Sequence, residues 1–189
     1  MGQRFDPSSS QFYLFFEVIL QTSQFRTSKN AQEFLTALKI IYLALMAGLV
    51  LLTLVAIYFV KLTEGIIPPD DGSLHKMFQY LVPGFALINV MMAYFLYGKR
   101  LQMTYNIDKL SYKLEIYRSI NILKAALFEG PGLLAAIGYL LIGQSLYLIV
   151  LGFILAVFAV NRPSKEKLIS ELKLSYEDKE IIENNLPLS

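Results

Sequence analysis

The apolar stretch from Ile120 to Val160 most constrains what this sequence can fold into, because its only charged residues are Lys124 and Glu129. As one helix, its roughly 41 residues would extend about 62 Å, whereas the hydrocarbon core of a bilayer is about 30 Å thick. We therefore expect this stretch to cross a bilayer twice, with a turn near Gly143–Gln144–Ser145.

Two earlier apolar runs, at about residues 38–60 and 77–97, have the length and composition of single membrane spans. Helix-ending residues, among them Pro68–Pro69 and Asp70–Asp71–Gly72, separate the two runs. Charged residues make up 17% of the chain, below the ~25% of soluble domains. The sequence thus predicts an all-α membrane protein with four transmembrane helices, at about 38–60, 77–97, 120–142 and 145–160.

The 189 residues are expected to form one membrane domain with two flanks. Residues 1–29 form a leader that is either disordered or interfacial, and 30–162 form the four-helix domain. Residues 163–189 form a helical tail. This length leaves no room for a separate soluble catalytic domain.

Composition excludes several kinds of chemistry. The chain has no cysteine and a single histidine, His75, without acids at ligand spacing, so we expect no metal site. Its net charge of +2 is too small to indicate nucleic acid. No phosphate-binding, hydrolase or dinucleotide motif is present. We therefore expect neither an enzyme nor a cofactor.

Lysine and arginine are unevenly distributed among the loops. They gather before the first span, in the connector between spans two and three, and in the tail. The opposite side of the predicted membrane holds only Lys61 and Lys76, around the loop between spans one and two. By the positive-inside rule both termini and the middle connector are predicted to be cytoplasmic.

The connector, residues 99–118, carries apolar residues at intervals of four, three, four and three, which is the pattern of one helix face. These residues are Met103, Ile107, Leu110, Leu114 and Tyr117. The sequence predicts an amphipathic helix that lies on the membrane surface or packs on a partner. In the tail, Pro163–Ser164 and Ser175 are predicted helix starts.

The two halves share short similarities. Ala44–Gly48 matches Ala126–Gly130, and Lys-Leu-Ser-Tyr occurs at 109–112 and again at 173–176. One interpretation is two repeated helical hairpins, each followed by a cytoplasmic helix. The other is chance matching between leucine- and alanine-rich segments.

Glu129 is the strongest candidate for chemistry. It lies five residues past Lys124, about 7–8 Å deeper along a helix. An ionised carboxylate at such a depth costs several kcal/mol unless it is paired. Glu129 is then either a proton or cation site, or a structural group that pairs with Lys124 or a hydroxyl and holds two helices in register.

Residues around Glu129 are expected to complete such a site. Asn89, in the middle of the second span, is predicted to hydrogen-bond Glu129 across helices. Proline removes a backbone donor from a helix. Helix breaks are therefore predicted in two places, at Pro83 and at the run Gly130, Pro131 and Gly132.

Two resemblances add expectations. Ala126–Pro131 and the tail from Arg162–Pro163–Ser164 to Lys167 resemble small four-span bacterial inner-membrane proteins of unknown function, which implies the bacterial inner membrane. A stretch of about ten to fifteen residues that includes Ala126–Pro131 is also similar to the ion-binding helix of rotary ATPase proteolipids, which implies that Glu129 carries an ion. The long connector departs from that family.

We expect a non-enzymatic accessory or assembly module that contacts the lipid bilayer. It would use the Met103–Tyr117 stripe and the tail to hold a partner in a membrane complex or a second copy of itself. The alternative is a small oligomeric transporter or channel that couples a proton or cation through Glu129.

Overall fold

The computed structural model describes residues 30–63 and 72–187, and every named element in these ranges is a helix. The helices are α2 (Ala31–Thr63), α3 (Gly72–Met103), the 3₁₀ turn η1 (Thr104–Asn106), α4 (Leu110–Ile142), α5 (Ser145–Val160), α6 (Lys165–Glu171) and α7 (Tyr176–Glu183). The predicted leader, 1–29, and the predicted loop residues Pro68–Asp71 lie outside the described residues.

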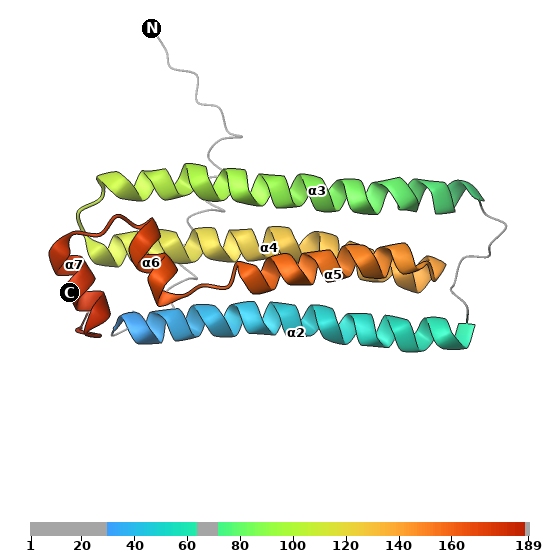
Figure 1. Cartoon of the computed structure of the whole chain (residues 1–189), viewed down its shortest axis with the longest axis horizontal. Coiled ribbons are helices and arrows are strands. Elements are labelled where there is room, and N and C mark those ends of the chain that lie inside the picture. The colour runs from blue at the N-terminus through green and yellow to red at the C-terminus, as the bar shows by residue number, and fades with distance from the viewer. Residues whose placement is uncertain (1–29, 64–71, 188–189) are drawn as a thin grey trace, which may run out of the picture.

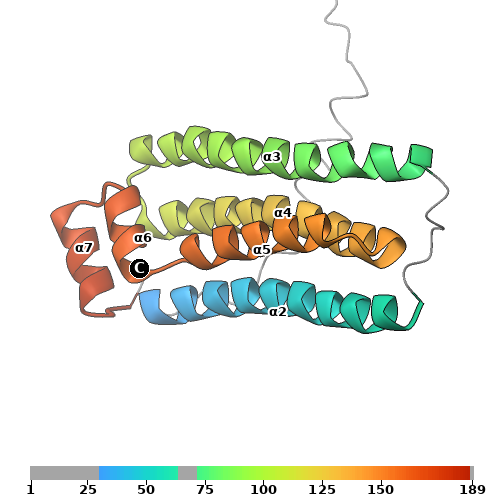
Figure 2. The same ribbon diagram turned by 45° about the vertical axis from the view of Figure 1, so that its right-hand side comes forward.

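Four long helices run side by side and alternate in direction (Figure 1). The α4–α5 hairpin lies in the middle, with α2 and α3 on its opposite flanks, as the turned view confirms (Figure 2). The short helices α6 and α7 lie across the end where α2 begins and α3 ends. At that end, Asn30 forms an isolated antiparallel bridge with Pro187.

The predicted turn between the last two spans is confirmed. Gly143 follows α4 with φ 77°, a left-handed conformation that favours glycine, and its N–H donates to the Tyr139 carbonyl at 2.7 Å. The chain reverses within two residues, so α5 returns directly along α4. Each predicted span lies within one of the four long helices.

Three helices, α2, α3 and α4, are long and apolar enough to cross a membrane. The fourth, α5, has 16 residues and meets the same criterion only when it is taken together with α6, across a bend of 75°. The most apolar part of α4 is 44% buried, against 22% for α2 and 17% for α3. Of these three helices, α4 is therefore the one that lies at the centre of the bundle.

The predicted connector helix 99–118 is wrong. α3 continues to Met103, the chain tightens into η1, and Ile107 is extended before α4 begins at Leu110. Asn106 and Asp108 favour turns over helix interiors, and Thr104 Oγ donates to the Leu101 carbonyl at 2.7 Å. The chain must reverse here for α4 to pack against α3.

The apolar stripe is consequently split. Leu110, Leu114 and Tyr117 are buried inside this chain, whereas Met103 is 59% exposed and Ile107 is half-buried. The sequence predicted one continuous apolar face that a partner could contact. The structure does not form such a face, because part of the stripe is buried inside this chain. Only the three stripe residues on α4 face the core, whereas Met103 ends α3 and Ile107 lies in the extended link between η1 and α4.

The predicted helix breaks are wrong, because neither site interrupts its helix. α3 continues through Pro83, and α4 continues through Gly130, Pro131 and Gly132. Helices tolerate such prolines where neighbouring groups satisfy the freed carbonyl, which is common in membrane proteins.

The two predicted hairpin repeats are not confirmed. α4 packs directly on α5, whereas α2 and α3 are separated by that hairpin (Figures 1 and 2). The second hairpin is followed by α6 and α7, the first only by the turn η1.

Two apolar clusters hold the helices together. In the middle of the bundle, Leu49 of α2 meets Phe128 of α4 and the α5 residues Ile154 and Phe158. At the end covered by the tail, residues from α2 and α4 meet α6 and α7: Phe34, Leu38, Leu114, Tyr117, Leu168, Leu172 and Ile182. The tail is thus part of the folded core.

Gly132 is the point of closest approach in the middle cluster. A Cβ atom at this position would lie 2.6 Å from Leu49 Cδ2 and 3.3 Å from Ile154 Cγ2. At Gly130, two residues away on the same helix, nothing lies within 4 Å of such an atom. The pair gives a matched test of packing.

We expect Gly132→Leu to lower the free energy of unfolding by about 1–3 kcal/mol, because added volume must displace Leu49 and Ile154. Gly130→Leu should change it much less. Denaturant unfolding in detergent micelles, followed by circular dichroism, measures both. Equal effects of the two substitutions would contradict this packing.

Candidate functional site

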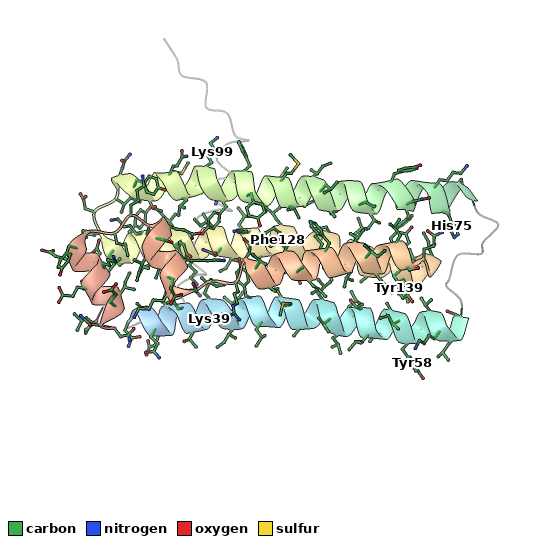
Figure 3. All side chains as sticks on the ribbon, in the orientation of Figure 1. Lys39, Tyr58, His75, Lys99, Phe128 and Tyr139 are labelled. Atoms are coloured by element: carbon green, nitrogen blue, oxygen red, sulfur yellow. The ribbon has the colours of Figure 1, made fainter. Side chains whose placement is uncertain are left out.

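The structure does not join the two residues of the predicted ion site. Glu129 is half-buried on α4, next to the fully buried Phe128, which Figure 3 shows pointing in among the helices. Asn89 Nδ2 donates to the Phe85 carbonyl of its own helix at 2.9 Å. The predicted hydrogen bond between Asn89 and Glu129 is therefore wrong.

Several polar side chains surround a different carboxylate, that of Glu171. Glu171, the last residue of α6, accepts hydrogen bonds on the same oxygen, Oε2, from the hydroxyls of Tyr97 and Tyr117. The Tyr117 bond measures 3.1 Å. One carboxylate oxygen thus joins the tail to both α3 and α4. We call Glu171 and the side chains around it the Glu171 cluster, consisting of Tyr94, Tyr97, Tyr117, Lys124, Asn161 and Glu171.

Lys124 provides the positive charge of this cluster. It is only 7% exposed, and its Nζ lies 4.1 Å from the ring centroid of Tyr97 and 4.9 Å from that of Tyr94. The ammonium is also within electrostatic range of the Glu171 carboxylate. Aromatic faces and a carboxylate together stabilise a cation that burial would otherwise disfavour. The sequence-based alternative that Lys124 pairs with Glu129 is replaced by this arrangement.

Asn161 extends the cluster to the end of α5. Its Nδ2 donates to the Tyr94 hydroxyl at 2.7 Å and to the Val157 carbonyl at 2.8 Å. Tyr94 in turn packs against the Phe128 ring, with centroids 6.0 Å apart. The cluster therefore connects α3, α4, α5 and α6, and it continues without a gap into the aromatic core of the bundle.

Further polar contacts hold the tail in place. Lys113 of α4 pairs with Asp178 of α7 at 3.6 Å, and both side chains are largely buried. Lys165 Nζ donates to the Glu183 carbonyl at 2.8 Å and fixes α6 to α7. The predicted helix starts are confirmed, because Ser164 Oγ accepts the Lys167 N–H and Ser175 Oγ accepts the Asp178 N–H.

A groove opens beside this end of the bundle, between α2 and the bend that joins α5 to α6. Its volume is about 510 Å³. Its walls carry an apolar part, with Leu43, Met46, Phe158 and Ala159, and a polar mouth, with Lys39, Arg162, Ser164 and Glu166. Lys39 lies on the side of α2 that faces α5 and α6 (Figure 3).

Within residues 30–63 and 72–187, no group of three or more His, Cys, Asp or Glu side chains is arranged to hold a metal ion. Comparison with protein-family models, with curated proteins and with solved structures finds no match to this chain. The two resemblances seen in Ala126–Pro131 and the tail stay predictions, and the geometry alone supports the functional argument.

Sequence reasoning missed Glu171, although a signal was present. Glu171 lies between the apolar positions Leu168 and Leu172 of one short helix, so its stem is carried toward the buried side. Tyr117 and Lys124 are seven residues apart on α4, and thus on one face. The partners come from α3, α4 and α6, which no local pattern brings together.

We expect Glu171→Gln to lower the free energy of unfolding by about 1–3 kcal/mol, because it removes charge-assisted bonds to two tyrosines and the counter-charge of Lys124. With Lys124→Met as the second substitution, a double-mutant cycle should show a coupling of about 0.5–3 kcal/mol. Denaturant unfolding in micelles measures each variant.

Glu180→Gln, which removes an exposed carboxylate from α7, is the control and should change stability by no more than about 0.5 kcal/mol. Strictly additive effects of the Glu171 and Lys124 substitutions would show that the two side chains do not interact.

Proposed function

We propose that this chain is a multi-pass membrane protein in which α2, α3, α4 and α5 each cross the bilayer. The exposed apolar surface supports this placement. Large hydrophobic side chains project from both flanking helices, as Tyr58 does from α2 in Figure 3. The most exposed of them are Leu43, Leu51, Tyr58, Leu62, Tyr80, Met91 and Phe95. A soluble monomer rarely exposes so large an apolar area.

The end that holds α6 and α7 is proposed to be cytoplasmic, in a bacterial inner membrane. Four antiparallel crossings return the chain to its starting side, and Asn30 does lie beside Pro187. Lysine and arginine gather at this end, where Lys99 projects away from α3 (Figure 3), whereas α2 and α3 carry only Lys61 and Lys76 near the other end.

We propose further that the protein acts as a non-enzymatic accessory or assembly module. The observation that carries this proposal is the Glu171 cluster, which joins α6 to α3 and α4 at one end of the bundle. The Lys113–Asp178 pair fixes α7 in the same way. The polar groups of this region hold helices together, and α7, held by its own contacts to α4 and α6, leaves its outer surface exposed.

The outer surface of α7 replaces the split stripe as the proposed contact surface. Tyr176 is 85% exposed, and Glu177, Glu180 and Glu183 are exposed beside it. This combination of one aromatic side chain with three carboxylates suits a basic segment of a partner protein in the membrane complex.

Reversing the charge of this surface should prevent partner binding. We expect Glu177→Lys with Glu180→Lys to lower recovery of the co-purified partner about tenfold after gentle detergent extraction, since like charges across an interface cost several kcal/mol. Quantitative mass spectrometry of the affinity-purified full chain measures this recovery.

Asp108→Lys, which reverses an exposed acid in the turn before α4, is the matched control and should leave recovery unchanged. Identical partner profiles for the native chain and the α7 variant would overturn the proposed contact surface.

One observation favours the second candidate, an oligomeric transporter or channel for a proton or cation. Among the described residues, no hydrogen bond or ion pair reaches the half-buried carboxylate of Glu129. The aromatic side chains of Tyr42, Phe128 and Phe158 fill the interior of the single chain, so a pathway would have to form between copies.

If Glu129 couples an ion, proton or cation flux into vesicles that contain the purified protein should be lost in Glu129→Gln. Glu115→Gln, which neutralises an exposed acid on the same helix, should keep the native flux. Flux that is absent from the native protein at every pH, or retained in Glu129→Gln, would remove this candidate.

A further inference from the structure

The groove between α2 and the α5–α6 bend has the layout of an amphiphile site. On α2, Lys39 precedes Leu43 and Met46 by four and seven residues, so the three side chains share one face. Met46 lies about 10 Å along the helix from Lys39, at 1.5 Å per residue. The groove thus changes from charged to apolar along the direction in which a bilayer would do so.

α5 contributes the same order of residues from the opposite wall. Near its end α5 carries the buried Phe158 and the exposed Ala159, and Arg162 stands two residues after the last helical residue, Val160. Because α5 runs antiparallel to α2, the cations of both walls come to the same end of the groove (Figure 1). Two cations from separate helices can therefore bind one anion together.

The charges at the mouth leave one positive charge in excess. Lys39 and Arg162 face a single carboxylate, Glu166. A hydrogen bond from the backbone N–H of Glu166 lowers the pKa of that carboxylate, with smaller contributions from Ser164 and from Lys39, so it is ionised at neutral pH. Within the described parts of the chain, no hydrogen bond or ion pair occupies Arg162.

We propose that this groove binds one anionic phospholipid, with its phosphodiester between Lys39 and Arg162 and one acyl chain along Leu43, Met46 and Phe158. The inference rests on the proposed membrane placement. A single phosphodiester balances the excess charge, whereas a zwitterionic headgroup brings its own ammonium and leaves that excess in place. The apolar wall distinguishes a lipid from free phosphate, which would gain nothing from it.

The test uses the full chain in detergent and titrates it with phosphatidylglycerol, phosphatidylethanolamine or inorganic phosphate, with native mass spectrometry to count bound molecules. We expect one tightly held phosphatidylglycerol. Lys39→Gln with Arg162→Gln should weaken it about tenfold or more, as loss of charge-assisted contacts implies. Lys99→Gln with Lys179→Gln removes two exposed cations elsewhere and should leave the affinity unchanged.

A second variant tests the apolar wall without touching charge. Met46→Trp should fill the groove and weaken phosphatidylglycerol while the protein stays folded by circular dichroism. Equal binding of phosphatidylethanolamine, equal losses in both cation pairs, or full competition by inorganic phosphate would overturn the lipid site.

Failure of the lipid site can be separated from failure of the membrane placement. A protein that stays in the membrane fraction after an alkaline carbonate wash, but binds phosphatidylglycerol equally well in all variants, refutes only the groove. Release of the chain into that wash without detergent would refute the membrane placement and the lipid site together.

Discussion

The half-buried carboxylate of Glu171, with its bonds to Tyr97 and Tyr117, is the interaction on which the position of α6 depends. Removing a carboxylate from water costs several kcal/mol, so such a group persists only where donors and a counter-charge replace its hydration. Here Tyr97, Tyr117 and Lys124 supply them, from two helices that lie far from α6 in sequence. The cluster favours the observed docking position of α6, because that position gives the carboxylate two hydroxyl donors and a nearby ammonium in place of water.

That docking position also shapes the groove. With α6 held across the bundle, the chain must bend by 75° after α5, and the bend brings Arg162, Ser164 and Glu166 opposite Lys39. Lys167 reinforces the bend, since its Nζ donates to the Val160 carbonyl at 2.7 Å, at the end of α5. The groove therefore depends on the Glu171 cluster that holds α6, whereas α7 is held by the Lys113–Asp178 pair and by the bond from Lys165 to the Glu183 carbonyl.

The sequence predicted correctly those features that depend on neighbouring residues alone, namely the apolar helices and several helix ends. The apolar runs lie within the four long helices, and Gly143, Ser164 and Ser175 mark ends that depend on a few neighbouring atoms. The connector prediction failed because the spacing at Met103–Tyr117 runs across a turn: only Leu110, Leu114 and Tyr117 share a helix face, and Met103 and Ile107 precede that helix. Glu171 was missed because its partners are set by tertiary packing, which one sequence does not display.

Lys124 and Glu129 show why depth along a helix does not determine the role of a charged residue. Five residues correspond to about 140° of rotation, so the two side chains leave α4 in different directions. Lys124 turns toward α3 and is enclosed by tyrosines, which makes it part of the fold. Glu129 turns away from that cluster and keeps a carboxylate that the described helices do not use. The proposed ion-coupling role of Glu129 therefore requires a group that a second copy or a partner brings to that face of α4.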